Sequence, residues 1–221
     1  MPPSRAERLL PPAPDPASIT NPALFVLRRG TSFVRCHDSS YGASEFNPRR
    51  DISQRFRPFV ARGRTVPTLY GSDELIGALS ETLFHMIPPE GRSRRIRASR
   101  LVAWLSSTLA PRRDLRLVDL RDEALEGHPL GLARADLIDS PATVYPETAE
   151  WASAFFHARA APDGLVWNAR QDRDKLAFVL FARGRVARSD LTIVDPPLSL
   201  FTTGFERVVE AAEAAGITIV R

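Results

Sequence analysis

Short apolar segments that end at turn-forming residues recur along this chain, and they constrain its fold more than any other feature. Such segments are rich in Val, Ile, Leu and Phe and too short for buried helices, so they predict strands. Amphipathic helices are expected between them, at 73–85, 146–157 and 205–216. Strands and helices follow neither strict alternation nor an all-β order, which predicts a single α+β domain of small mixed sheets with flanking helices. The clearest strand segments are LFVL, LRLVDL, DGLVW and KLAFVLF.

The first 22 residues contain seven of the 19 prolines. Proline lacks a backbone N–H and restricts the residue before it, so no long helix fits there. We expect residues 1–22 to form a disordered proline-rich leader and residues 23–221 to form the folded domain.

Several classes of protein are excluded by composition. Cys36 is the only cysteine, so no intrachain disulfide forms. No apolar stretch approaches the ~18 residues of a membrane span, and the N-terminus lacks the apolar core of a secretory signal. We therefore expect a cytoplasmic protein without membrane contact. Four scattered histidines lack ligand spacing, so no metal site is expected.

The basic run Arg92–Arg100 has no interleaved aromatic residues, and the net charge is only +4. We interpret this run as an exposed turn, without direct nucleic-acid binding. A helix is expected to follow it, at about 100–109.

The helix expected from Ser72 or Asp73 to about His85 presents Glu81 nearly opposite its apolar stripe. Periodicity leaves two readings of Glu81, a surface carboxylate or a carboxylate in a cleft. The stripe itself, which should face the core, consists of Leu75, Ile76, Leu79, Leu83 and Met86.

Three segments, in this order, resemble the RES-domain family, which is named for an Arg, a Glu and a Ser. They are FVRCHDSSYGASEFNP, then RFRPF with VPTLYGSDELIGALSETLFH, and DGLVWNARQDRDKLAFVLF. The resemblance implies a fold similar to ADP-ribosyltransferases and a toxin of a bacterial toxin–antitoxin pair. It also implies that NAD is a substrate rather than a resident cofactor, and that a helix-turn-helix antitoxin is the partner. A homodimer stays open.

The resemblance also implies site residues. Arg35 in FVRCH and Glu81 in ALSETLFH match the family arginine and glutamate, the expected catalytic pair. Arg55 resembles the second site arginine and Tyr70 the site tyrosine, both expected to bind NAD. A carboxylate suits this chemistry because it stabilises the cationic ribose that forms as nicotinamide leaves. Arginine forks suit a pyrophosphate.

Simpler roles stay open for these side chains. Arg35 and Arg55 could pair with Asp38 or Asp51 on a loop surface, and Tyr70 could simply pack on the core. The chain departs from the family at Ala169, where W-x-S-R is replaced by WNAR. We expect Asn168, Arg170 or Gln171 to supply the polar contact with NAD that the missing hydroxyl would make.

The expected function is cleavage of the nicotinamide–ribose bond of NAD by phosphorolysis or hydrolysis. Two alternatives remain: ADP-ribosylation of a protein, or a catalytically weakened homologue that binds a nucleotide or the antitoxin.

Overall fold

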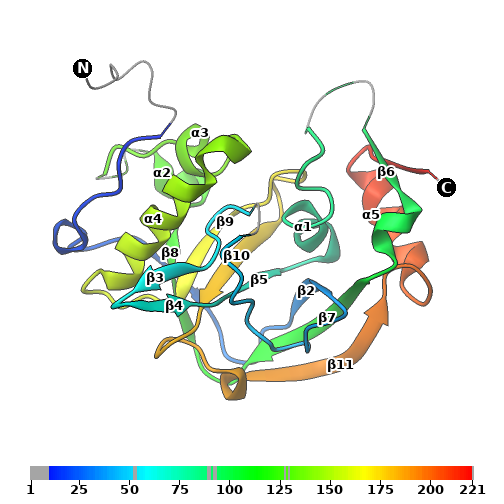
Figure 1. Cartoon of the computed structure of the whole chain (residues 1–221), viewed down its shortest axis with the longest axis horizontal. Helices are drawn as coiled ribbons and strands as arrows, with labels where there is room; N and C mark the ends of the chain where they lie inside the picture. Colours follow the sequence, from blue (N-terminus) through cyan, green and yellow to red (C-terminus); the bar gives the residue numbers. More distant parts are fainter. Residues whose placement is uncertain are drawn as a thin grey trace.

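The computed structural model describes residues 10–51, 54–88, 91, 94–126, 128 and 130–220, with the backbone alone at 134 and 135. Most of its strands form one curled eight-stranded sheet (Figure 1). Only β8 and β9 run parallel to each other in it. In spatial order the strands are β1 (Leu24–Leu27), β8 (Leu115–Asp119), β9 (Gly164–Asn168), β10 (Leu176–Phe181), β5 (Thr68–Ser72), β2 (Phe33–Asp38), β7 (Trp104–Pro111) and β11 (Leu191–Ser199). The predicted α+β class is confirmed.

Helices cover this sheet in two groups that Figure 1 shows apart from each other. One group is α2 (Asp122–Leu125), α3 (Arg134–Leu137) and α4 (Tyr145–His157); the other is α1 (Leu75–Ser80) and α5 (Phe205–Ala214). Two small sheets complete the fold: the hairpin of β3 (Phe59–Ala61) and β4 (Arg64–Val66), and the parallel pair of β6 (Arg95–Arg97) and β12 (Thr218–Val220). No helix among the described residues combines the length and the apolar character that crossing a membrane requires.

The central strands are buried on both faces, which explains their continuous apolar sequences. On β10, Val179 and Phe181 join the core beneath α4, whereas Phe178 and Leu180 join the core on the opposite face. A third core lies beneath α1 and α5. Edge strands β1 and β11 are more exposed.

The structure differs from the expected disordered leader over residues 10–22. Leu10 and Ile19 are buried in the core beneath α4, and Trp151 Nε1 donates a hydrogen bond to the Pro11 carbonyl (2.9 Å). The prolines prevent a long helix, as predicted, but they do not prevent packing in an extended form. Residues 1–9 lie outside the described residues.

Two predicted helices are wrong in extent or kind. The segment expected as a helix at about 100–109 is mostly strand β7, in which Ser106, Ser107 and Thr108 favour an extended chain over a helix. Helix α1 ends at Ser80 rather than near His85. Just there, the hydroxyls of Ser80 and Thr82 donate to carbonyls four residues earlier and compete with the helix. Met86, placed on the apolar stripe by periodicity, is therefore 69% exposed.

Candidate functional site

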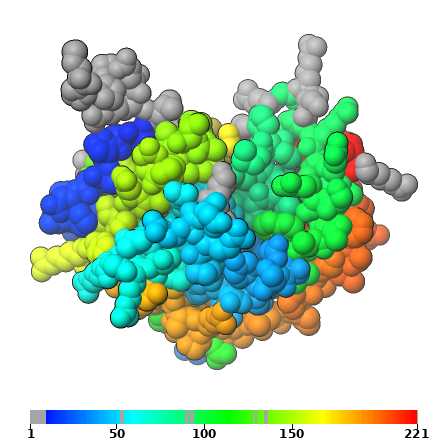
Figure 2. All heavy atoms as spheres, in the orientation of Figure 1, coloured from blue at the N-terminus to red at the C-terminus, as the bar shows by residue number. Residues whose placement is uncertain are grey.

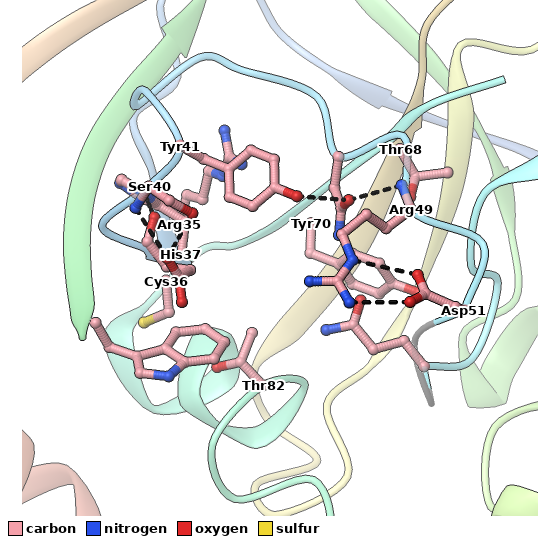
Figure 3. Close-up of a pocket in the computed structure, with 14 residues that line it drawn as sticks. Arg35, Cys36, His37, Ser40, Tyr41, Arg49, Asp51, Thr68, Tyr70 and Thr82 are labelled. Carbon is pink, nitrogen blue, oxygen red and sulfur yellow. Dashed lines mark hydrogen bonds and ion pairs between the residues drawn. The ribbon is translucent and has the colours of Figure 1, made fainter. Parts of the chain in front are cut away.

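A cavity of about 420 Å³ opens where β2, β5 and the start of β7 meet the segment from Asp38 to Gln54. Figure 3 shows Arg35, Cys36 and His37 on one side of it and Arg49 with Asp51 on the other. Figure 2 shows the covering segment, blue to cyan, on the near face of the molecule between α4 (yellow-green) and the residues near 100 (green). Both the volume and the mixed polar and aromatic lining suit a small-molecule ligand.

Arg35 projects from β2 into this cavity. Its Nη1 donates to the Gly42 and Ala43 carbonyls, at 3.3 and 2.6 Å, and so anchors the covering segment. Burial lowers the pKa of Arg35 to about 10, against the attraction of Glu45, so the side chain remains cationic at neutral pH. Asp38 and Asp51, its alternative partners on sequence grounds, bind elsewhere: Asp38 accepts from Ser40, and Asp51 pairs with Arg49.

Tyr70 lies between the cavity and a buried polar cluster. It lines the cavity from β5, and its hydroxyl is buried without a hydrogen-bond partner among the described residues. Burial, together with the nearby Glu81 charge, holds the pKa of Tyr70 well above its usual value. The neutral hydroxyl is therefore available to donate a hydrogen bond.

Glu81 is a buried carboxylate rather than a surface one, because it is only 3% exposed, and it does not itself line the cavity. It is the C-cap residue of α1. That helix can approach β5 closely because residue 77 is glycine, and a Cβ there would collide with Ser72 Oγ. Glu81 Oε2 accepts from Arg55 Nη1 (3.1 Å), and Oε1 accepts from the backbone N of Arg170 (3.3 Å). These bonds fix the orientation of the carboxylate.

The cluster around Glu81 contains more cationic than anionic groups. Arg55 is 1% exposed, and its Nε and Nη2 have no partner among the described residues. Arg170 Nη1 donates to the His85 carbonyl (3.3 Å). The buried Nε of Arg170, like the two Arg55 nitrogens, has no hydrogen-bond partner among the described residues. Buried donors without acceptors are costly. The unpaired donors of Arg55 and Arg170 therefore suit an anionic ligand.

His85 and Tyr145 complete the cluster. The Tyr145 hydroxyl is hydrogen bonded to His85 Nε2. Burial lowers the pKa of His85 to about 4, and the positive charges of Arg55 and Arg170 act in the same direction against the attraction of Glu81. His85 is therefore neutral at pH 7, and the pair adds hydrogen-bonding groups without adding charge.

The expected site residues fall into two adjoining places and one separate one. Arg35 and Tyr70 line the cavity, while Arg55, Glu81 and Arg170 meet in the buried cluster behind it. The cavity and the cluster adjoin each other, because Gln54 and Thr82, the sequence neighbours of Arg55 and Glu81, line the cavity.

Asn168 lies apart from both. Its Oδ1 accepts from the Asp122 backbone N (2.9 Å), and its Nδ2 donates to the Arg173 carbonyl (2.8 Å). These bonds hold the start of α2, so the structure does not bring this side chain to the cavity. Ala169 is fully buried in the core beneath α4, in the same cluster as Trp167 and Phe56.

Four residues of the candidate site were not predicted from the sequence. Arg49 and Tyr41 line the cavity from a loop whose polar composition gave no signal beyond a turn. Tyr145 is separated from His85 by 60 residues, so only the fold brings them together. His85 itself ends the A-x-x-E-T-x-x-H segment, and that spacing could have identified it.

The whole arrangement lies within the part of the chain that matches a known family. A family model described as "RES domain" matches residues 32–201 of the 221. The chain matches no curated protein and no solved structure significantly.

Proposed function

This chain belongs to the RES-domain family, and on that premise we propose that it cleaves the bond between nicotinamide and ribose in NAD as the cytoplasmic toxin of a toxin–antitoxin pair. One observation carries the proposal: a buried carboxylate, Glu81, is oriented by Arg55 at 3.1 Å and by a backbone N–H, directly behind a cavity lined by Arg35 and Tyr70. A helix-turn-helix antitoxin that covers this cavity is the proposed partner.

The chemistry requires little proton transfer at the leaving group. The C1′–N bond breaks, its electron pair leaves with neutral nicotinamide, and positive charge develops on the ribose. Glu81 would stabilise that charge, at a position where burial strengthens the electrostatic interaction. Water or phosphate then attacks C1′ and loses a proton, which gives ADP-ribose or its 1-phosphate.

Binding would rest on the cationic groups. Arg35 and Arg49 face the cavity from two sides and suit the two charges of the pyrophosphate. The unpartnered donors of Arg55 lie next to Glu81, where they suit a ribose hydroxyl or a phosphate oxygen. Tyr70 offers a ring against which nicotinamide or adenine can stack.

The test is turnover of NAD by the purified full chain, with Glu81→Gln as the variant and Glu74→Gln as the matched control. Glu74 precedes the same helix but is exposed and pairs with Lys175. We expect Glu81→Gln to lose about 100-fold or more in kcat/KM, and Glu74→Gln to keep its rate. Because Glu81 is buried against Arg55, Gln should also lower stability, so both variants are assayed well below their Tm.

Product chromatography separates the alternatives. Nicotinamide release that depends on phosphate indicates phosphorolysis, and release without phosphate indicates hydrolysis. Release only with added protein, which becomes labelled, indicates ADP-ribosylation. NAD that remains intact at high protein concentration would contradict the enzyme proposal.

The last outcome would favour a second candidate function, that of a weakened homologue that binds a nucleotide or the antitoxin. Ala169 supports this candidate, because the family serine is replaced there by a methyl group at 0% exposure.

A further inference from the structure

A second hollow, of about 660 Å³, lies away from the candidate site and shares no lining residue with it. Its wall is formed by the β3–β4 hairpin, the end of α4 and the turn that follows β10, which lie together at the lower left of Figure 1. We call it the arginine hollow, because Arg62, Arg64, Arg183 and Arg185 line it together with His157.

The four arginines come from one sequence motif that occurs twice. The residues at 61–64 and at 182–185 both read Ala-Arg-Gly-Arg. Both copies form turns in which the Arg and the Gly have positive φ: 48° and 71° at Arg62 and Gly63, 56° and 82° at Arg183 and Gly184. The two turns are joined directly, because Arg183 Nε donates to the Thr65 carbonyl and the Ala182 N–H donates to the Pro67 carbonyl.

Arginine is an unfavourable choice for these turn positions. A turn with two positive φ angles favours Asn, Asp or Gly at its first position, and other side chains are strained there. This strained backbone at an arginine occurs twice around the same hollow. Local strain of this kind marks a side chain that is retained for something other than stability.

The charge of the hollow is not neutralised by its surroundings. No Asp or Glu belongs to its lining, and among the described residues no ion pair is formed by any of its four arginines. Arg185 Nη2 donates to the Phe156 carbonyl (2.9 Å), its buried Nε has no described partner, and its guanidinium lies 4.8 Å from the centre of the Phe156 ring.

The floor of the hollow is rigid and apolar. Val66 is fully buried, and Phe156 stacks edge to face with Phe59 and Phe181, at 5.5 and 5.9 Å between ring centres. These three rings tie β3, α4 and β10 together beneath the hollow. Arg185 packs on one of them, whereas Arg62, Arg64 and Arg183 are exposed around the rim.

We propose that the arginine hollow binds a small anion carrying several phosphate groups. Four guanidinium groups exceed what a single phosphate needs, and arginine forks bind phosphate oxygens in pairs. The volume lies in the range of small-ligand sites, which favours a compact anion over a nucleic-acid strand. Nucleoside polyphosphates and inorganic polyphosphate share this chemistry.

Calorimetric titration of the full chain with tripolyphosphate, ATP and AMP tests the proposal at about 150 mM salt, where non-specific attraction is screened. We expect saturable binding of tripolyphosphate, with AMP at least about tenfold weaker because it carries a single phosphate. Comparable affinities for ATP and tripolyphosphate would identify the phosphate chain as the whole ligand. Tighter ATP binding would identify a nucleoside polyphosphate.

The variant Arg62→Asn/Arg183→Asn removes two charges, and asparagine accepts the left-handed backbone, so the fold should be kept. We expect its affinity for tripolyphosphate to fall about tenfold or more. The matched control Arg97→Asn/Arg100→Asn removes the same charge from exposed positions elsewhere and should change affinity by less than about twofold. Arg64→Ser, at an ordinary strand position, is a second variant with the same expected direction.

Four results would overturn the proposal. They are the absence of saturation by any phosphate probe, equal losses in the control variant, and tighter binding of a single-stranded oligonucleotide than of ATP. The fourth is a loss caused by Arg35→Ala instead of Arg62→Asn/Arg183→Asn, because the anion would then occupy the candidate site. None of these results depends on NAD turnover.

Discussion

Burial, more than any single charge, sets the ionisation of the side chains around the candidate site. It lowers the pKa values of Arg35 and His85, to about 10 and about 4, and raises the pKa of Cys36 to about 12. The effect of burial is to disfavour whichever form is charged. At neutral pH His85 and the buried thiol of Cys36 are therefore neutral.

The neutral state of His85 makes stability depend on pH. The folded pKa of about 4 lies below the ordinary value of 6.5, so the unfolded chain binds more protons between these values. The free energy of unfolding should therefore fall as the pH is lowered from about 6.5 towards 4, by up to roughly 3 kcal/mol from this residue. Urea denaturation at several pH values measures the slope.

His85→Asn should flatten that slope and lower stability at neutral pH, where His85 is uncharged, because Tyr145 loses its partner. His157→Asn is the matched control. The pKa values of His37 and His128 are also lowered by burial, so some slope will persist in all variants. An unchanged slope in His85→Asn would show that folding does not lower the pKa of His85.

Ala169 offers a second test at the scale of one residue. Its methyl group shares a buried cluster with Trp167 and Phe56, and Tyr70 packs against that cluster. Trp167 Nε1 and the Tyr70 hydroxyl are buried there without described partners. Ala169→Ser would place the family hydroxyl beside these donors, and on the proposed function we expect it to raise kcat/KM for NAD about fivefold, the equivalent of ~1 kcal/mol.

Steady-state kinetics and thermal melting check this expectation together, with Ala152→Ser, another fully buried alanine of the same core, as the control. A large drop in Tm with no gain in rate would show that the added hydroxyl finds no partner.

Sequence reasoning at this scale identified side chains but not their partners. The motif around Glu81 marked the residue, yet its two neighbours are 26 and 89 positions away along the chain. Helical periodicity could not decide between surface and cleft, because α1 ends at Ser80 and Glu81 is no longer on a helical face. Contacts of this kind arise only from the folded chain.

Among the elements, the short 3₁₀ turn η1 (Pro16–Ser18) and its flanks extend the domain beyond the expected boundary at residue 23. Ile19 is 3% exposed and Leu10 is 6% exposed, both against the core beneath α4. Proline fixes φ in this segment and so reduces the entropy lost when it packs. The segment therefore stabilises α4.

We expect Ile19→Ala to lower the free energy of unfolding by about 2–3 kcal/mol, the usual effect of a cavity at a buried aliphatic residue. Thr20→Ala, the exposed neighbour, should change it by less than about 0.5 kcal/mol. Urea denaturation at neutral pH provides both values. Equal effects of the two substitutions would mean that this segment detaches from α4 in solution.

Strands were predicted correctly where the sequence is a continuous apolar run. They were missed where the segment mixes strand-forming residues with proline or polar residues. The apolar runs of β9 and β10 identified central strands. Strand β11 was not among the expected strands, and it contains Pro196 and Pro197. An edge strand with register shifts tolerates prolines, since one side of it forms no ladder.

For the molecule as a whole, the cavity collects residues from distant parts of the fold. Its walls include β2, β5, β7 and the covering segment, and the buried cluster behind it adds α1 and α4. A ligand that fills the cavity contacts elements belonging to separate cores, so its binding energy should stabilise the entire domain. The fold class was predictable from element order, but this convergence was not.

ADP-ribose, the expected product, is the probe for this coupling because the enzyme does not consume it. At a concentration about 100 times its Kd it should add ~2.7 kcal/mol of stability, a rise in Tm of roughly 5–10 °C for a domain of this size. Differential scanning fluorimetry of the full chain measures the shift, with nicotinamide alone as the control. Arg35→Ala should abolish it, because Arg35 lines the cavity that would hold the pyrophosphate. A shift that persists in Arg35→Ala but disappears in Arg62→Asn/Arg183→Asn would show that ADP-ribose binds in the arginine hollow instead, and would contradict the proposed position of the NAD site.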